Sequence, residues 1–370
     1  MKVPQNSLHL VLSILVAFII VDAAIWLATR TTGLLQDVVD IQTPATLYAK
    51  LNYFRGFDGR RIAFLGDSVV YGRRMEEAGD SNWRAHTIPS HVETKLRAAF
   101  PQQNILTMNL AMNGALPADL EQAVRLISPL KPDCIVADIS LRAFSADFAT
   151  ETNRYSRNWL RYMQIDSSFD LHTNDPGWDL TGRIEARLRD LALSYWSLYR
   201  MRDFVQWRVF NSEPSEAVRR FRDWLDQRLS AKSPDVADPL DDMLLMMKAK
   251  NRHDSVTLGD ENPQVIALRH TLDRLATDKQ CAVFFYATEE KQQLAQLMDP
   301  QRYQKLQSEL KQIFTPYADR GITFIPPLDS LKSEFYLDYG HLDDAGNAIV
   351  AGAILEGGVS QSIARSTGTR

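Results

Sequence analysis

A serine, a histidine and an aspartate occur in this chain where they could work together as a nucleophile and its base. Ser68 ends a Gly-Asp-Ser tripeptide directly after the apolar run 61–65, which predicts a buried strand that stops in a tight turn. Parallel α/β sheets carry their chemistry at such strand ends. An alcohol is a poor nucleophile at neutral pH, so Ser68 needs a base. His341 can take that proton, and Asp338 can fix the tautomer of its imidazole. Alternatively, Ser68 only caps a turn, and Asp338 and His341 form an ordinary hydrogen-bonded pair in a loop.

The segments around Ser68 and around His341 resemble the motifs of a known family. Gly66-Asp67-Ser68 and Asp338-x-x-His341 resemble the SGNH (GDSL-type) hydrolase superfamily, in which the first block bears the nucleophilic serine and the last bears the aspartate and histidine. The resemblance covers about residues 60–145 and 278–356, with a long unmatched stretch between them. It implies acyl transfer through an acyl-enzyme.

Acyl transfer also needs donors aimed at the oxyanion of the tetrahedral intermediate. The backbone N–H of Ser68 is one natural donor. The segment 109–115 resembles the family's second block, in which a glycine donates, and this implies Gly114 as the second donor. The same glycine could equally be a turn residue. Asp67 and Asn113, the neighbours of these two donors, are further candidates for oxyanion or substrate binding.

The third block departs from the family pattern. The family usually has Gly-x-Asn there, and the asparagine donates to the oxyanion, but alignment on Pro132-Asp133 places Arg142 at the asparagine position. Arg142 could donate to the oxyanion or bind an anionic substrate group. It could equally pair with Asp138 or Asp147 in a structural role. This departure points away from typical secreted lipases and ordinary esterases.

The order of apolar segments predicts the fold. Strands expected at 61–65, 104–110, 134–139, 281–287 and 322–325 alternate with helices expected at 89–99, 117–127, 300–317 and from Asp343 or Asp344 through 355. We expect an α/β fold: a flavodoxin-like, three-layer parallel sheet with helices on both faces. The domain spans 60–356 and is interrupted by a large, mainly helical insertion at 145–278. After residue 357 a polar, flexible tail is expected.

The aromatic residues of the insertion have two interpretations. Trp and Tyr side chains stack on sugar rings, but they also dominate ordinary cores, and core packing is the default. Because the insertion follows the third strand, it could form a lid or a polymer-binding surface near the site. The aromatic residues in question are Trp159, Tyr162, Trp178, Tyr195, Trp196, Tyr199 and Trp207.

The N-terminal segment predicts a membrane anchor. Residues 8–28 are almost continuously apolar and long enough to cross a bilayer. No good cleavage site follows, so we expect an uncleaved single-pass helix within 1–30 and a stalk at 31–59. The expected location is the inner (cytoplasmic) membrane, with the catalytic domain on the extracytoplasmic, periplasmic side. Asp22 inside the span could snorkel to the interface or face a membrane partner.

Composition excludes several other classes. The 370 residues carry a net charge of −4 and no basic stripe with interleaved aromatics, so nucleic-acid binding is not expected. Cys134 and Cys281 are too few for a disulfide framework, and their places at the starts of buried strands favour small core residues. No histidines are spaced like metal ligands, so neither a catalytic metal nor a cofactor is expected.

Together these features predict a membrane-anchored serine acyl-transfer enzyme. It would O-acetylate or deacetylate a cell-surface or exported polysaccharide or another acylated glycan. The architecture is similar to the alginate O-acetylation and teichoic-acid D-alanylation proteins, which work beside a membrane-bound acyltransferase, and this implies such a partner through the N-terminal helix. Two alternatives remain: a catalytically silent binding or scaffold subunit, and a membrane-anchored esterase of small esters or lipids.

Overall fold

The chain contains a five-stranded parallel sheet with the strand order β2-β1-β3-β4-β5. The structure is a computed structural model and describes residues 5–31, 50–51, 53–72, 74–148, 196–200 and 253–365. The strands are β1 (Arg60–Leu65), β2 (Ile105–Asn109), β3 (Cys134–Ile139), β4 (Ala282–Tyr286) and β5 (Ile322–Ile325). Every residue of β3 and β4 is buried, as expected for strands covered on both faces.

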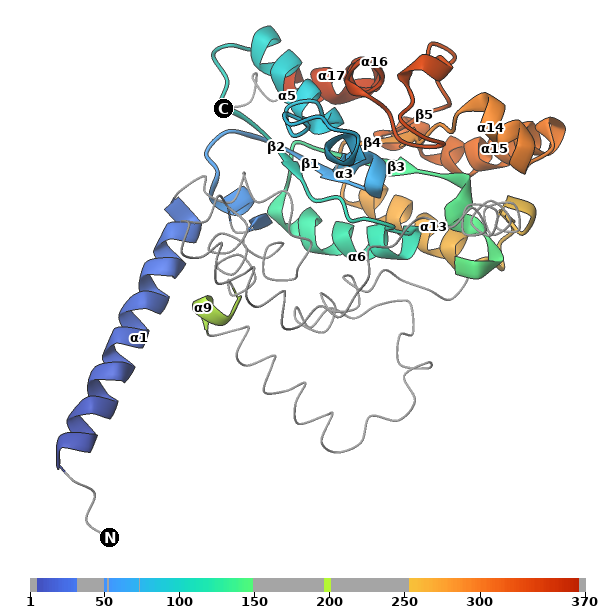
Figure 1. The fold of residues 1–370 in the computed structure, drawn as a ribbon. Coiled ribbons are helices and arrows are strands. Elements are labelled where there is room, and N and C mark those ends of the chain that lie inside the picture. Colours follow the sequence, from blue (N-terminus) through green and yellow to red (C-terminus); the bar gives the residue numbers. More distant parts are fainter. Residues whose placement is uncertain are drawn as a thin grey trace. The chain divides into compact units, whose positions relative to one another are not determined.

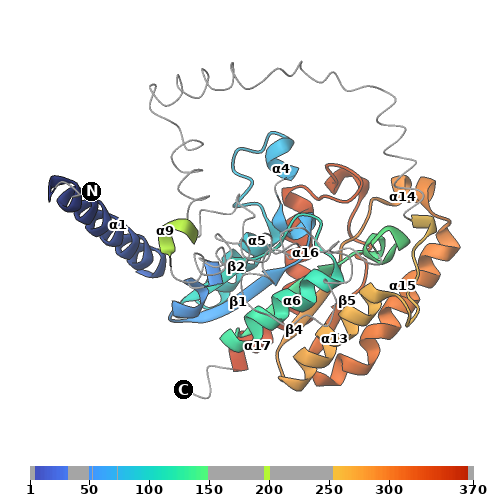
Figure 2. The ribbon, with the colours of Figure 1, turned by 90° about the horizontal axis from the view of Figure 1, so that it is seen from below.

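Helices cover the sheet on both sides (Figure 1). On one side lie α5 (Ile88–Ala99), α16 (Asp344–Ile354) and α17 (Ser360–Arg365), and on the other lie α6 (Pro117–Ile127) and α13 (Pro263–Thr277). Figure 2 views the molecule from the side of α6 and α13. Beside β5, Phe314 of α15 (Pro300–Phe314) stacks on Phe324 with ring centroids 4.3 Å apart. The helix α14 (Lys291–Leu297) precedes α15 in the chain. The three-layer α/β fold predicted from the sequence is therefore present.

Local sequence signals explain where the covering helices begin. α6, α13 and α15 have proline in the first turn, where its missing N–H costs no helical hydrogen bond. Asn262 and Asp299 cap α13 and α15 by accepting N–H bonds from the first turn, and Asp343 does the same for α16. The helix α13 forms the C-terminal end of the stretch 145–278 and packs on α6. This part of the expected insertion therefore belongs to a layer that covers the sheet.

The structure corrects part of the prediction of a flexible tail after residue 357. After α16 the chain continues through a π-helical turn (Leu355–Val359) into α17. Val359 and Ile363 lie four residues apart, and both are fully buried. Two apolar side chains at helical spacing are enough to hold this segment against the domain. Residues 366–370, most of 149–252 and the stalk segment 32–49 lie outside the described residues. So do five of the seven insertion aromatics.

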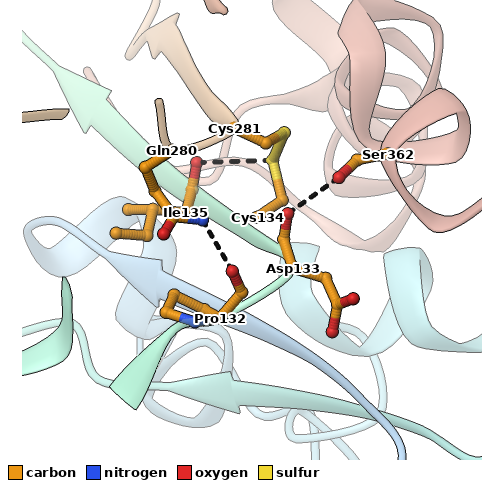
Figure 3. Close-up of a disulfide and its surroundings, with 7 residues drawn as sticks. All are labelled: Pro132, Asp133, Cys134, Ile135, Gln280, Cys281 and Ser362. Carbon is orange, nitrogen blue, oxygen red and sulfur yellow. Dashed lines mark hydrogen bonds between the residues drawn. A yellow bond between two sulfur atoms is a disulfide. The ribbon is translucent and has the colours of Figure 1, made fainter. Parts of the chain in front are cut away.

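The two cysteines form a disulfide, which corrects their assignment as separate core residues (Figure 3). Cys134 opens β3 and Cys281 immediately precedes β4, its neighbour in the sheet, so their Cα atoms lie only 4.6 Å apart. Ser362 of α17 donates to the carbonyl of Asp133 at 2.7 Å beside this bond. The disulfide joins the amino ends of the two strands and closes a loop with a sequence separation of 147 residues.

A second compact unit, separate from the sheet domain, contains α1 (Gln5–Thr31) and α9 (Ser197–Arg200). Phe18 of α1 contacts Trp196 with ring centroids 5.0 Å apart, and Trp196 stacks on Tyr199 at 5.5 Å. Among the described residues, no helix combines the length and the apolar character needed to cross a membrane. The transmembrane helix expected within 1–30 therefore stays a prediction.

Candidate active site

The nucleophile candidate sits on a strand-turn-helix junction. β1 ends at Leu65, and the short helix α3 (Ser68–Tyr71) begins three residues later. Asp67 is the N-cap of α3, and its Oδ1 accepts the Val69 N–H at 2.8 Å. Ser68 is therefore the first helical residue, a position whose N–H has no partner within the helix. This leaves the Ser68 N–H suited to the oxyanion role predicted for it.

Only glycine fits the turn before the serine. Gly66 has φ +138°, and a Cβ built on it would lie 2.0 Å from Oδ1 of Asp138. β1 and β3 are parallel neighbours with Leu65 opposite Ala137, so the ends of the two strands meet here. Asp138 Oδ1 also accepts the Asp67 N–H at 3.0 Å. The strand beside β1 thus fixes the backbone that presents Ser68.

The structure brings the three predicted triad residues together. His341 Nε2 lies 2.8 Å from Ser68 Oγ, and His341 Nδ1 lies 2.8 Å from Oδ1 of Asp338. All three side chains are half-buried, so a substrate can reach them. The loop that carries Asp338 and His341 is tied to the end of the sheet, because the Glu290 N–H donates to the Tyr339 carbonyl at 2.9 Å.

The surroundings of Asp338 keep it ionised. Burial pushes its pKa upward, but hydrogen bonds from His341 and from the backbone N–H of Gly340 outweigh burial and lower the pKa well below its ordinary value. Arg74 adds an ion pair, with Nε 2.8 Å from Oδ2. A carboxylate that only accepts must receive the Nδ1–H of His341. Nε2 then carries the lone pair and can accept the Ser68 hydroxyl proton.

Arg142 lies beside the nucleophile turn, but its ion-pair partner is Asp67 rather than Asp138 or Asp147. Arg142 Nη2 is 2.7 Å from Asp67 Oδ2. Burial pushes the pKa of Asp67 upward, yet the Arg142 charge and hydrogen bonds from Asp138, Val69 and Arg142 lower it overall. Burial, followed by the Asp67 charge, raises the pKa of Asp138 well above its ordinary value. The neutral form of Asp138 is therefore favoured beside the Asp67 carboxylate.

A second buried polar cluster adjoins Arg142. Tyr286 and Tyr303 both donate to Oε2 of Glu289, at 2.7 and 3.1 Å, while the buried Oε1 has no hydrogen-bond partner among the described residues. Burial raises the pKa of Glu289 to about 6, against these two hydrogen bonds and the Arg142 charge. Tyr339, next to Asp338, bonds through its hydroxyl to the buried His253. Sequence reasoning had found no role for His253.

The predicted second oxyanion donor lies in the loop after β2. Gly114 is exposed with φ +71°, beside the exposed Asn113. The loop is joined to the nucleophile turn, because the Met112 N–H donates to the Gly66 carbonyl at 2.8 Å. No contact of Gly114 with Ser68 is found in the described part of the chain, so its donor role stays a prediction. Among the described residues, no group of three or more His, Cys, Asp or Glu side chains could hold a metal ion.

Sequence reasoning missed two residues that shape the site. Arg74 reaches Asp338 across 264 positions, and no local pattern signals such a pair. Glu289 follows β4 by three residues, and its place at the carboxyl end of a core strand was a signal that could have singled it out.

Comparisons with known proteins give a distant fold likeness. No family model matches the chain, and no curated protein matches it. Among solved structures, an alpha/beta hydrolase enzyme from the metagenome of Lake Arreo, Spain, is 12% identical with a TM-score of 0.38, covering 84% of this chain and 99% of that one. An acetyl xylan esterase from Geobacillus stearothermophilus is 15% identical with a TM-score of 0.34, covering 83% and 95%. A second variant of that esterase is 14% identical with a TM-score of 0.33, covering 81% and 94%.

Proposed function

We propose that this protein is an SGNH-type serine acyl-transfer enzyme that adds acetyl groups to, or removes them from, hydroxyls of a glycan. The observation that carries the proposal is the continuous hydrogen-bond chain from Ser68 through His341 to Asp338, with both His341 contacts at 2.8 Å. A serine that only caps a turn has no need of a half-buried imidazole whose other nitrogen is held by an ionised carboxylate.

In the first half-reaction, Ser68 Oγ attacks the acyl carbonyl carbon while its proton passes to His341 Nε2. Asp338 accepts the Nδ1–H throughout and stabilises the imidazolium that forms. The tetrahedral oxyanion is held by the N–H of Ser68 and by the predicted donor Gly114. Collapse breaks the bond to the leaving alcohol, which takes the proton from Nε2, and leaves the acyl group esterified to Ser68.

In the second half-reaction, His341 Nε2 removes a proton from the acceptor hydroxyl. The acceptor oxygen attacks the acyl carbon, and Ser68 leaves as its hydroxyl when the proton returns from the imidazolium. Water as acceptor gives an esterase, and a sugar hydroxyl gives an O-acetyltransferase. Both reactions use the same residues, and the surroundings of the acyl-enzyme select between them.

We also propose that the sheet domain works outside the cytoplasm. The disulfide between Cys134 and Cys281 supports this location, because structural disulfides persist in oxidising compartments and are rare in the cytosol. The proposed glycan substrate is reached in the same compartment.

The test compares acetyl transfer and hydrolysis directly. The full chain is incubated with a small acetyl ester, with and without oligosaccharide acceptors, and free acetate and acetylated oligosaccharide are quantified. We expect product formation that disappears in Ser68→Ala and His341→Ala. Full activity in both variants would show that the reaction does not use this triad. No product of either kind, from a protein that is folded by circular dichroism, would instead favour a silent scaffold subunit.

A further inference from the structure

Asp67 is a junction for three groups around the nucleophile. Its Oδ1 accepts the Val69 N–H at the start of α3, its Oδ2 receives the guanidinium of Arg142, and its backbone N–H donates to Oδ1 of Asp138. The Asp67 side chain is only 7% exposed. A buried carboxylate needs compensating partners, and Arg142 is its only ion-pair partner in the described part of the chain.

Arg142 is itself mounted on a fixed turn. It belongs to a 3-10 helix (Leu141–Phe144) that directly follows β3, and the side chains of Leu141 and Phe144 are fully buried. The Phe144 carbonyl accepts the Asn262 side-chain amide at 2.8 Å, which ties this turn to the start of α13. The position of the guanidinium is therefore set by the sheet and its covering helices.

The charge of Arg142 is already compensated. Asp67 lies against one side of it, and the buried Glu289 acts on it electrostatically without a direct ion pair. A cation paired with one carboxylate and attracted by a second carboxyl group has little net charge left for an anionic substrate group or for a developing oxyanion. Its direct contact is with Asp67, the residue whose backbone precedes Ser68.

We infer that Arg142 is a positioning residue that holds the Ser68 turn through Asp67, in place of the oxyanion donor that its sequence position suggested. This inference rests on the proposed function, because it concerns how the proposed nucleophile is held. In this chain the third block would thus stabilise the turn that carries Ser68, and backbone N–H groups alone would bind the oxyanion.

A double-mutant cycle separates the two roles of Arg142. The full chain is made as Arg142→Gln, Asp67→Asn and the double variant, and kcat and KM are measured on a neutral acetyl ester. Because a small displacement of reacting groups can cost about 100-fold in rate, we expect each single variant to lose about 100-fold in kcat with KM unchanged. If Arg142 acts through Asp67, the double variant loses the same factor. Independent roles would multiply to a loss of about 10,000-fold and would overturn the inference.

A substrate comparison provides a readout that misfolding does not move. The ratio of kcat/KM for the neutral ester to that for an acetyl ester with a carboxylate on its leaving group is independent of the folded fraction. We expect wild type and Arg142→Gln to give the same ratio, and a selective loss on the anionic ester would overturn the inference. Asp147→Asn is the matched control, since it removes an exposed acid five positions after Arg142 and keeps the ion pair between Arg142 and Asp67.

The failure of this inference and the failure of the proposed function are distinguishable. If the wild type shows no Ser68-dependent turnover, the proposed function fails and the inference falls with it. If the wild type turns over but the single losses multiply, only the role of Arg142 is refuted.

Discussion

Breaking the bond between Cys134 and Cys281 should lower stability by an amount that the length of its loop sets. The bond joins positions 147 apart, and loop-closure entropy for that length corresponds to about 5 kcal/mol. Measured disulfides commonly contribute about 2–4 kcal/mol, so we expect the free energy of unfolding to fall by about 2–5 kcal/mol on reduction. The loop closed by the disulfide also contains the whole stretch 145–278, so the bond joins the two strands, β3 and β4, between which that stretch lies in the sequence.

The assay is urea unfolding followed by circular dichroism, with and without a phosphine reductant. The matched control is the double variant Cys134→Ala/Cys281→Ala, which should unfold like the reduced wild type and should not respond to the reductant. Thiol titration of the unreduced, denatured protein should find no free thiol. Two free thiols, or identical unfolding curves for wild type in both conditions, would refute the reasoning.

Three further predictions concern the site. Glu289→Gln should remove a pH dependence of stability. Because the native pKa of Glu289, about 6, lies above the ordinary 4.5, the free energy of unfolding of the wild type should fall by about 2 kcal/mol as pH rises from 4.5 to above 6, and that of the variant should not. The same pH dependence of the free energy of unfolding in both proteins would contradict this. Gly66→Ala should destabilise by about 2–5 kcal/mol, because its Cβ would meet Asp138, and thermal melts should show a far smaller loss in Gly259→Ala, where the new Cβ has open space and φ is not left-handed. Arg74→Gln should lower kcat/KM by no more than about fivefold, since an exposed ion pair such as that with Asp338 contributes at most about 1 kcal/mol; a loss of about 100-fold would count against it.

The sequence was most informative where the signal is local. The strands β3 and β5 were predicted with their observed bounds, because both are short, mainly apolar runs between turn residues. The three candidate triad residues were singled out because each lies at the end of a strand or just before a helix. The tail was wrongly predicted to be flexible throughout, because most of its residues are polar and only the side chains of Val359 and Ile363 are buried in the domain.

What the sequence did not predict depends on which elements are neighbours. The disulfide requires that β3 and β4 lie side by side, which is known only once the strand order is known. The partner of Arg142 was sought among acids close in sequence, whereas Asp67 lies 75 positions away on the neighbouring strand end. Contacts of this kind follow from topology and leave no periodic trace in a single chain.

The most direct test of the central claim is the mass of the intact protein after exposure to a fluorophosphonate. An activated Ser68 attacks phosphorus and expels fluoride, which adds one phosphonyl group. We predict a single adduct on wild type, mapped to Ser68 by peptide mass spectrometry, with none on Ser68→Ala and a much slower one on His341→Ala. A folded wild type that stays unmodified, or that is labelled equally fast without His341, would contradict the claim that Ser68 is an activated nucleophile.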